Sequence, residues 1–137
     1  MIPLRRTVLL LAAVLVMAAC GKSGCNVIDE IVFQRSLFLG EYPELRVQGI
    51  PAVTEVGGVA GLIVINTGTG YIAFDRCSTV DPSRRCAVEV DETNMLAIDP
   101  CSGAKWILIN GSPAEIAECP LKPYHVRKQG DIITVSN

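Results

Sequence analysis

Two apolar runs joined by a glycine-rich turn decide the fold: Gly61-Leu62-Ile63-Val64-Ile65-Asn66, then Thr67-Gly68-Thr69-Gly70, then Tyr71-Ile72-Ala73-Phe74-Asp75. Both runs are rich in β-branched and aromatic residues, which favour strands, and the glycines between them favour a tight turn. Residues 68–73 also match the dinucleotide-binding pattern Gly-x-Gly-x-x-Ala, but that chemistry requires a helix to begin at the turn. Because residues 71–74 have strand character, we predict a β-hairpin here.

The rest of the chain repeats this alternation of short apolar runs with polar turns. Turn clusters such as Gly57-Gly58, Asp91–Asn94 and Gln129–Asp131 separate the runs. Their regular spacing predicts an all-β fold, a β-sandwich or barrel of about ten short strands. The expected strands are residues 31–33, 37–39, 45–47, 59–65, 71–74, 87–90, 95–98, 106–109, 124–126 and 132–135.

A single helical signal interrupts this pattern. Ser112 is followed by Pro113 and, three residues after the serine, by Glu115. A capping serine, a proline at the first helical position and a glutamate at the third form a capping box. We therefore expect one or two helical turns at this point.

The N-terminal segment carries an export signal. Arg5-Arg6 precede an unbroken apolar run, Val8–Ala19, and Leu15–Cys20 resembles a lipobox, in which the cysteine is diacylated before cleavage. A membrane anchor is the alternative, but twelve helical residues rise only about 18 Å, less than a hydrocarbon core of about 30 Å. The two arginines also leave a twin-arginine signal open. We predict a lipoprotein signal peptide at residues 1–19, with Cys20 as the lipidated residue.

The expected domain boundaries follow from this signal. Residues 20–26 are short, polar and glycine-rich, which is typical of a tether, and residues 27–137 form the domain. No aspartate follows Cys20, so the retention signal for the inner membrane that is known in some bacteria is absent. We therefore expect an exported protein attached by its lipid to a membrane, preferably the outer membrane, facing the periplasm.

Length and charge exclude several classes of protein. The chain has 137 residues and a formal charge of −2, with 12 Lys+Arg against 14 Asp+Glu, so it offers no basic excess for nucleic acid. One domain accounts for this length. The expected partners are the membrane, through the lipid, and an unknown protein or ligand.

Five cysteines follow the lipidation site: Cys25, Cys77, Cys86, Cys101 and Cys119. An oxidising compartment favours disulfides, and an odd number leaves at least one cysteine unpaired. No C-x-x-C spacing occurs and the sequence has one histidine, so a zinc site is not expected.

The remaining chemical candidates indicate a structural role. Asp29-Glu30 and Asp91-Glu92 are adjacent acids in turns, which are usually solvated rather than catalytic. His125 lies on an expected strand without a nucleophile tied to it, and Trp106 sits in an apolar strand, where it should close the core. We expect no catalytic residue and no enzyme activity.

Four stretches together resemble the Rieske iron–sulfur domain, from about Val27 to Asn137. They are Gly61–Cys77, Asp99–Trp106, Pro120–Val126 and the closing strand Gly130–Val135. Rieske clusters are held by two cysteine thiolates on one iron and two histidines on the other. The resemblance places Cys77 at the first thiolate, Thr79 at the first histidine, Asp99 at the second thiolate and Ser102 at the second histidine.

The resemblance therefore implies a Rieske-like fold whose ligand set is degenerate, with no cofactor and no metal expected. In the respiratory branch of the family a disulfide joins the two ligand loops, which implies a Cys86–Cys101 bridge here, with Cys77 as the rival partner. Cys119 has no place in the family pattern. The implied function is a membrane-tethered binding or structural module.

Two alternatives stay open. Cys77, Cys86, Cys101 and Cys119 could hold a [2Fe–2S] cluster through four thiolates, which would make the protein an electron carrier. Thiol redox chemistry at Cys77 or Cys119 is the other alternative, because arginines beside a cysteine lower the pKa of its thiol.

Overall fold

The structure, a computed structural model, describes residues 24–137. This part of the chain forms ten β-strands and two short 3-10 helices. The elements are β1 (Gln34–Phe38), η2 (Pro43–Arg46), β2 (Pro51–Thr54), β3 (Leu62–Asn66), β4 (Tyr71–Asp75), η3 (Pro82–Arg84), β5 (Glu89–Val90), β6 (Leu96–Ile98), β7 (Lys105–Ile107), β8 (Ser112–Glu115), β9 (Pro123–Gln129) and β10 (Ile132–Ser136).

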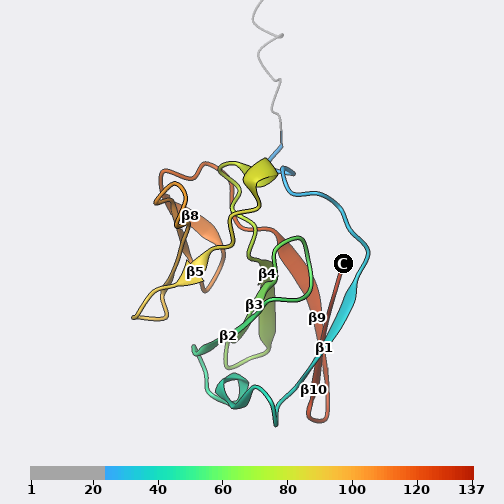
Figure 1. Ribbon diagram of the computed structural model, residues 1–137. Coiled ribbons are helices and arrows are strands. Elements are labelled where there is room, and N and C mark those ends of the chain that lie inside the picture. The colour runs from blue at the N-terminus through green and yellow to red at the C-terminus, as the bar shows by residue number, and fades with distance from the viewer. Residues whose placement is uncertain (1–23) are drawn as a thin grey trace, which may run out of the picture.

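The strands form two antiparallel sheets (Figure 1). Six strands form the larger sheet in the order β1-β10-β9-β4-β3-β2, and four form the smaller sheet in the order β5-β6-β7-β8. The smaller sheet is inserted between β4 and β9, which are neighbours in the larger sheet. The predicted all-β fold of about ten short strands is confirmed.

The predicted hairpin is formed by β3 and β4, which pair from Leu62 with Asp75 to Asn66 with Tyr71. The Thr67 N–H donates to the Gly70 carbonyl across the turn, at 2.9 Å. A strand follows the glycines where a nucleotide site would require a helix. The interpretation of residues 66–70 as a hairpin turn is confirmed.

Strand β3 is buried on both faces and separates two hydrophobic cores. Leu62 and Val64 belong to the core of the larger sheet, whereas Ile63 and Ile65 pack against the smaller sheet around Trp106. Trp106 is completely buried, as expected for a residue that closes a core. The two sheets therefore share β3 as their common support.

Three sequence-based expectations about local structure were wrong. Residues 45–47 fall partly in η2, which begins with Pro43 at its first position, and residues 31–33 are extended without pairing in a sheet. β2 was missed, because a proline opens it and its buried side chains are only Ala52 and Thr54. Proline is nevertheless tolerated at the first residue of a strand.

The helical turn expected at Ser112 was also wrong. Ser112 and Pro113 pair with Ile107 and Trp106 of β7, so residues 112–115 form β8, an edge strand. An edge strand tolerates proline, since one side of its backbone has no partner strand. Pairing in the sheet outweighs the local capping pattern.

The predicted signal peptide and Cys20 lie outside the described residues, as does the tether up to residue 23. Within residues 24–137, no helix has the length and apolar character needed to cross a bilayer.

Candidate functional site

The positions that the resemblance assigns to cluster ligands lie on two loops. Cys77 and Thr79 follow β4, and Asp99 and Ser102 lie between β6 and β7. The structure brings these loops together through a hydrogen bond from the Ser78 hydroxyl to the Asp99 carboxylate, at 2.7 Å. We call this contact region the loop junction.

Asp99 is the centre of the loop junction and is 2% exposed. One carboxylate oxygen accepts hydrogen bonds from the hydroxyls of Ser78 and Ser102, at 2.7 and 2.6 Å, and the other accepts the Cys101 N–H at 2.8 Å. Burial by itself raises the pKa of this carboxyl group. The hydrogen bonds from Ser102, Ser78 and the loop backbone outweigh that effect and hold the pKa below its ordinary value. Asp99 therefore lies here as a charged, hydrogen-bonded group.

A disulfide between Cys86 and Cys101 crosses the same junction, with 6.3 Å between the two Cα atoms. This is the pairing that the resemblance implied. The Cys86, Cys101 and Asp99 ligand atoms lie within 4.8 Å of one another, so they form a possible metal-binding group. Both sulfurs are already bonded to each other, which removes them as thiolate ligands.

Cys77 is the one free cysteine among residues 24–137 and is completely buried. Cys77 was expected as the rival disulfide partner, and this was wrong, because Cys86 bonds to Cys101. The Cys77 Sγ instead faces the carbonyl oxygens of Ser78 and Pro82, both at 3.8 Å. Burial and the nearby Asp75 carboxylate raise the pKa of the Cys77 thiol to about 11. A thiol with that pKa is almost entirely protonated near neutral pH and is a poor nucleophile.

Thr79 and Trp106 both bind the backbone of Cys119. The Thr79 hydroxyl and the Trp106 indole N–H donate to the Cys119 carbonyl, at 2.9 and 2.8 Å. The first loop is thereby held against the segment that precedes β9.

Cys119 forms the second disulfide, with Cys25, 94 residues away in sequence. This pairing was not predicted from the sequence, because Cys25 was assigned to the tether. One signal was present: Cys119 lay outside the family pattern, and so did Cys25.

The residues of the loop junction do not fit a Rieske-type cluster. That cluster requires two thiolates and two imidazoles. The structure places at the four positions a buried protonated thiol, two hydroxyls and a carboxylate whose oxygens are occupied by serine and backbone donors. The all-cysteine alternative also lacks free ligands in this structure, since Cys86, Cys101 and Cys119 are in disulfides.

A second buried carboxylate, Asp75, lies at the base of the first loop. It accepts hydrogen bonds from the Val59, Ala60 and Cys77 N–H groups and from the Tyr124 hydroxyl, at 2.5, 3.1, 2.8 and 2.6 Å. Burial, followed by the hydrogen bond to Asp75, raises the pKa of Tyr124, so the phenol remains a donor. We call this group the β4 junction, and it joins the loop before β3 to β4 and β9.

A glycine is required beside the β4 junction. Gly58 has a φ of 59°, and a Cβ at this position would collide with the Asp75 carboxylate. The close approach of the loop backbone to Asp75 therefore depends on the absence of a side chain.

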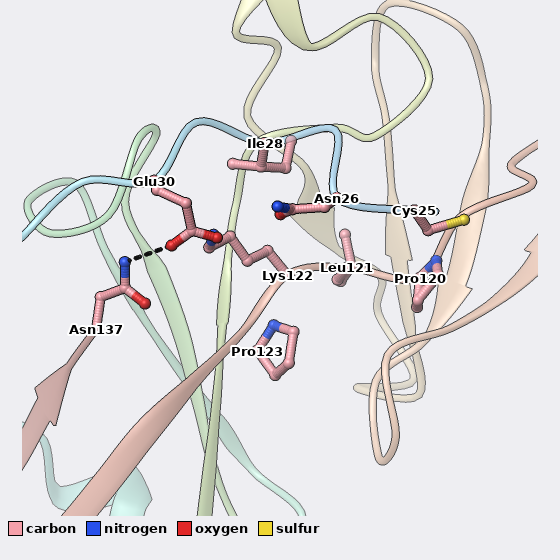
Figure 2. A pocket seen from close by; sticks show the side chains of 9 residues that line it. All are labelled: Cys25, Asn26, Ile28, Glu30, Pro120, Leu121, Lys122, Pro123 and Asn137. Atoms are coloured by element: carbon pink, nitrogen blue, oxygen red, sulfur yellow. Dashed lines mark hydrogen bonds and ion pairs between the residues drawn. The ribbon is translucent and has the colours of Figure 1, made fainter. Parts of the chain in front are cut away.

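The N-terminal segment from Cys25 to Glu30 lies over the chain that leads into β9 and lines a hollow of about 380 Å³ (Figure 2). The disulfide to Cys119 holds one end, Ile28 is buried, and Glu30 forms an ion pair with Lys122 and accepts a hydrogen bond from the Asn137 side chain. These hydrogen bonds, from Asn137 first and then Lys122, lower the pKa of Glu30. Glu30 of the Asp29-Glu30 pair therefore helps to attach the N-terminal segment to the domain.

The other candidates from the sequence lie apart from these junctions. Asp91 accepts backbone hydrogen bonds from Met95 and Leu96 within a turn, with the Thr93 hydroxyl on its other oxygen. His125 is exposed on β9. Asp91 thus closes its own exposed turn, and no side-chain hydrogen bond of His125 occurs among the described residues.

The sequence matches no protein-family model and no curated protein. Among solved structures, the chain is similar to the ferredoxin of carbazole 1,9a-dioxygenase from Nocardioides aromaticivorans, with 20% identity over 77% of this chain and 97% of that chain and a TM-score of 0.49. It is also similar to a ferredoxin from Sphingomonas yanoikuyae, with 16% identity over 66% of this chain and 88% of that chain and a TM-score of 0.47.

Proposed function

We propose that this protein is an exported, lipid-anchored domain of Rieske-like fold that carries no iron–sulfur cluster and acts as a binding or structural module. One observation carries the cluster-free part of the proposal. Asp99, at a position that the resemblance assigns to a cluster ligand, instead joins both loops through hydrogen bonds from Ser78, Ser102 and the Cys101 backbone.

The disulfide at the loop junction weighs against the four-cysteine cluster, but the equivalent bridge accompanies the cluster in the respiratory branch of the Rieske family. The Cys86–Cys101 disulfide ties the two loops together beside Asp99. A bridge that closes a loop of this length contributes about 3 kcal/mol to stability. The disulfide therefore stabilises the contact between the loops and removes Cys86 and Cys101 as cluster ligands, while the cluster-free proposal itself rests on Asp99.

The environment of Cys77, the one free cysteine among the described residues, argues against thiol redox catalysis. A redox-active thiol requires a lowered pKa and access to solvent, whereas Cys77 is completely buried and its pKa is raised to about 11. Cys119, the other candidate of this class, is bonded to Cys25. These two observations support a module without enzyme activity.

The lipid anchor is the second part of the proposal and rests on the lipobox Leu15–Cys20. Acylation of Cys20 leaves a thioether and no free thiol. Full-length protein extracted from membranes and denatured without reductant should therefore show one reactive thiol per chain, that of Cys77. Three or more thiols would contradict the disulfide-bonded module and favour the four-cysteine cluster.

Anchoring itself is tested by separating cell membranes from the soluble fraction. The wild-type chain should stay with the membranes, and Cys20→Ser should not be acylated and should lose membrane attachment after cleavage or fail to be cleaved. Cys77→Ser is the matched control, because it removes a thiol that the proposal gives no role in lipidation. Equal labelling of Cys20→Ser and wild type by a radioactive fatty acid would contradict the anchor.

A further inference from the structure

Among the described residues, the first point at which the N-terminal chain is fixed to the domain is Cys25. Its disulfide to Cys119, the burial of Ile28 and the Glu30–Lys122 ion pair hold the segment from Cys25 to Glu30 against the domain (Figure 2). The sequence predicted a flexible tether as far as residue 26. Only residues up to 24 can act as free tether while this disulfide is intact.

A lipid at Cys20 would therefore hold the domain on a very short tether. Four residues, 21–24, separate Cys20 from Cys25. Five fully extended Cα-to-Cα steps reach roughly 17 Å. A domain of this size has a radius of gyration of about 13 Å, so its far end lies much farther from the attachment point than the tether can reach. The face around Cys25 must stay near the bilayer.

That face carries exposed apolar side chains. Val27, Val80 and Ile116 are 39%, 42% and 64% exposed. All three line one hollow of about 580 Å³ together with both half-cystines of the Cys25–Cys119 bond. We call these three residues the N-terminal apolar face. Apolar side chains gathered where a lipid tether begins are suited to the boundary between headgroups and acyl chains.

Ile116 adds a second observation. Its backbone φ is 65°, a left-handed conformation that β-branched residues rarely adopt. The position holds neither glycine nor asparagine, the residues that adopt this conformation most readily. The Ile116 side chain is also the most exposed of the N-terminal apolar face. Strained conformations that persist at exposed positions often mark a functional surface.

Charge around the face does not favour an anionic partner. Glu118 lines the same hollow, and Asp29, Asp81 and Arg85 line the adjoining one. These three acids outnumber the two bases, Arg85 and Lys22 of the tether, so the face is weakly acidic and does not attract acidic headgroups. Contact with lipid must therefore come from apolar burial and should not require anionic lipids.

We propose that the N-terminal apolar face lies against a zwitterionic bilayer and inserts Val80 and Ile116 at its surface. This inference rests on the proposed acylation of Cys20. The orientation turns the opposite end of the larger sheet, with η2 and the turn between β9 and β10, away from the membrane (Figure 1). That outer end would then be accessible to a soluble partner, and the membrane would cover the approach from the side of the N-terminal apolar face.

Tryptophan quenching by lipids tests the orientation in the full acylated chain. Ile116→Trp and the control Ile132→Trp are reconstituted in vesicles of phosphatidylcholine, with or without bromine on the acyl chains. Ile132 is a matched control, since it is also an exposed isoleucine, 38% exposed, but lies at the start of β10 beside the outer turn. Trp106 is completely buried in every variant and gives a constant background.

Brominated lipid should reduce the emission from Ile116→Trp about twofold and leave Ile132→Trp unchanged. Val80→Trp should behave like Ile116→Trp, and it replaces that variant if the left-handed position rejects tryptophan. Vesicle flotation distinguishes a wrong orientation from a missing lipid anchor. Protein that floats with vesicles but is quenched at neither or at both ends overturns the orientation alone, whereas protein that does not float overturns the acylation and the orientation together.

Discussion

The β4 junction and the loop junction both join separate segments through a buried carboxylate, but their hydrogen-bond donors differ. Asp75 and Asp99 are both buried carboxylates that hold separate segments together, but Asp75 binds three backbone N–H groups and a tyrosine, whereas Asp99 binds two serine hydroxyls and one N–H. Backbone donors cannot turn away when the acceptor is lost, and serine hydroxyls can. The β4 junction should therefore be the rigid base of the first loop, and the loop junction the adaptable end.

The largest expected effect is the loss of the Asp75 charge. Asp75→Asn keeps the shape of the side chain but replaces an acceptor by an N–H₂ group that faces other donors. The asparagine keeps one of the two oxygens, so two of the four donors lose their acceptor, which should lower the free energy of unfolding by about 3–5 kcal/mol. Urea unfolding followed by tryptophan fluorescence measures this loss. A cost below about 1 kcal/mol would show that the four hydrogen bonds do not hold the β4 junction.

The next effect should come from the disulfide at the loop junction. Cys86→Ser/Cys101→Ser should lower the free energy of unfolding by about 3 kcal/mol, since the bridge closes a loop of 15 residues. The same unfolding assay under non-reducing conditions applies, with the Cys25–Cys119 bridge intact. If the double variant is as stable as wild type, the loops are held by the Asp99 hydrogen bonds alone.

Asp99→Asn should cost less than Asp75→Asn, about 2 kcal/mol, because two of the three donors can rotate to other acceptors. The two asparagine variants form a matched pair, since each removes one buried carboxylate charge and keeps the side-chain volume. The comparison between the junctions would be reversed if Asp99→Asn proved the more damaging of the two.

The smallest effect is a dependence of stability on pH. Hydrogen bonds hold the pKa of Asp99 below its ordinary value in the folded protein, so the carboxylate stabilises the fold above the unfolded pKa of about 3.9. That contribution is lost as the pH falls through the lower, folded pKa. Stability should therefore decline below about pH 4, and the decline should be shallower in Asp99→Asn than in wild type. Equal slopes in the two proteins would contradict a charged Asp99.

The sequence predicted the parts of the fold that depend on local pattern. The run Leu62–Ile65, the glycine turn and Tyr71–Asp75 specified the central hairpin, because side-chain type and turn chemistry act within a few residues. Residues 112–115 and β2 were mispredicted although each pairs with its neighbour in sequence, β7 and β3, because the capping pattern at Ser112 and the prolines at positions 51 and 113 obscured their strand character. The Asn110-Gly111 turn between β7 and β8 was the local signal for this hairpin, and the capping pattern at Ser112 was preferred to it.

Part of the candidate site was predicted from the sequence, and part of it is visible only in the folded structure. The resemblance singled out Asp99, Ser102 and the Cys86–Cys101 bridge, and all of them lie at the loop junction. Ser78 was missed because it lies between two supposed ligand positions, and only the fold shows that its hydroxyl reaches Asp99. The Cys25–Cys119 bond was missed because residues 94 apart in sequence leave no local trace of contact.

Iron content, together with visible absorption, tests the central claim most directly. The full-length protein is purified from membranes without exposure to air and denatured only for the metal assay. We expect a colourless, folded protein without stoichiometric iron, because the positions assigned to the cluster ligands hold a buried thiol, two hydroxyls and a hydrogen-bonded carboxylate. Two irons per chain with charge-transfer bands in the visible range would contradict it and would identify the protein as an electron carrier.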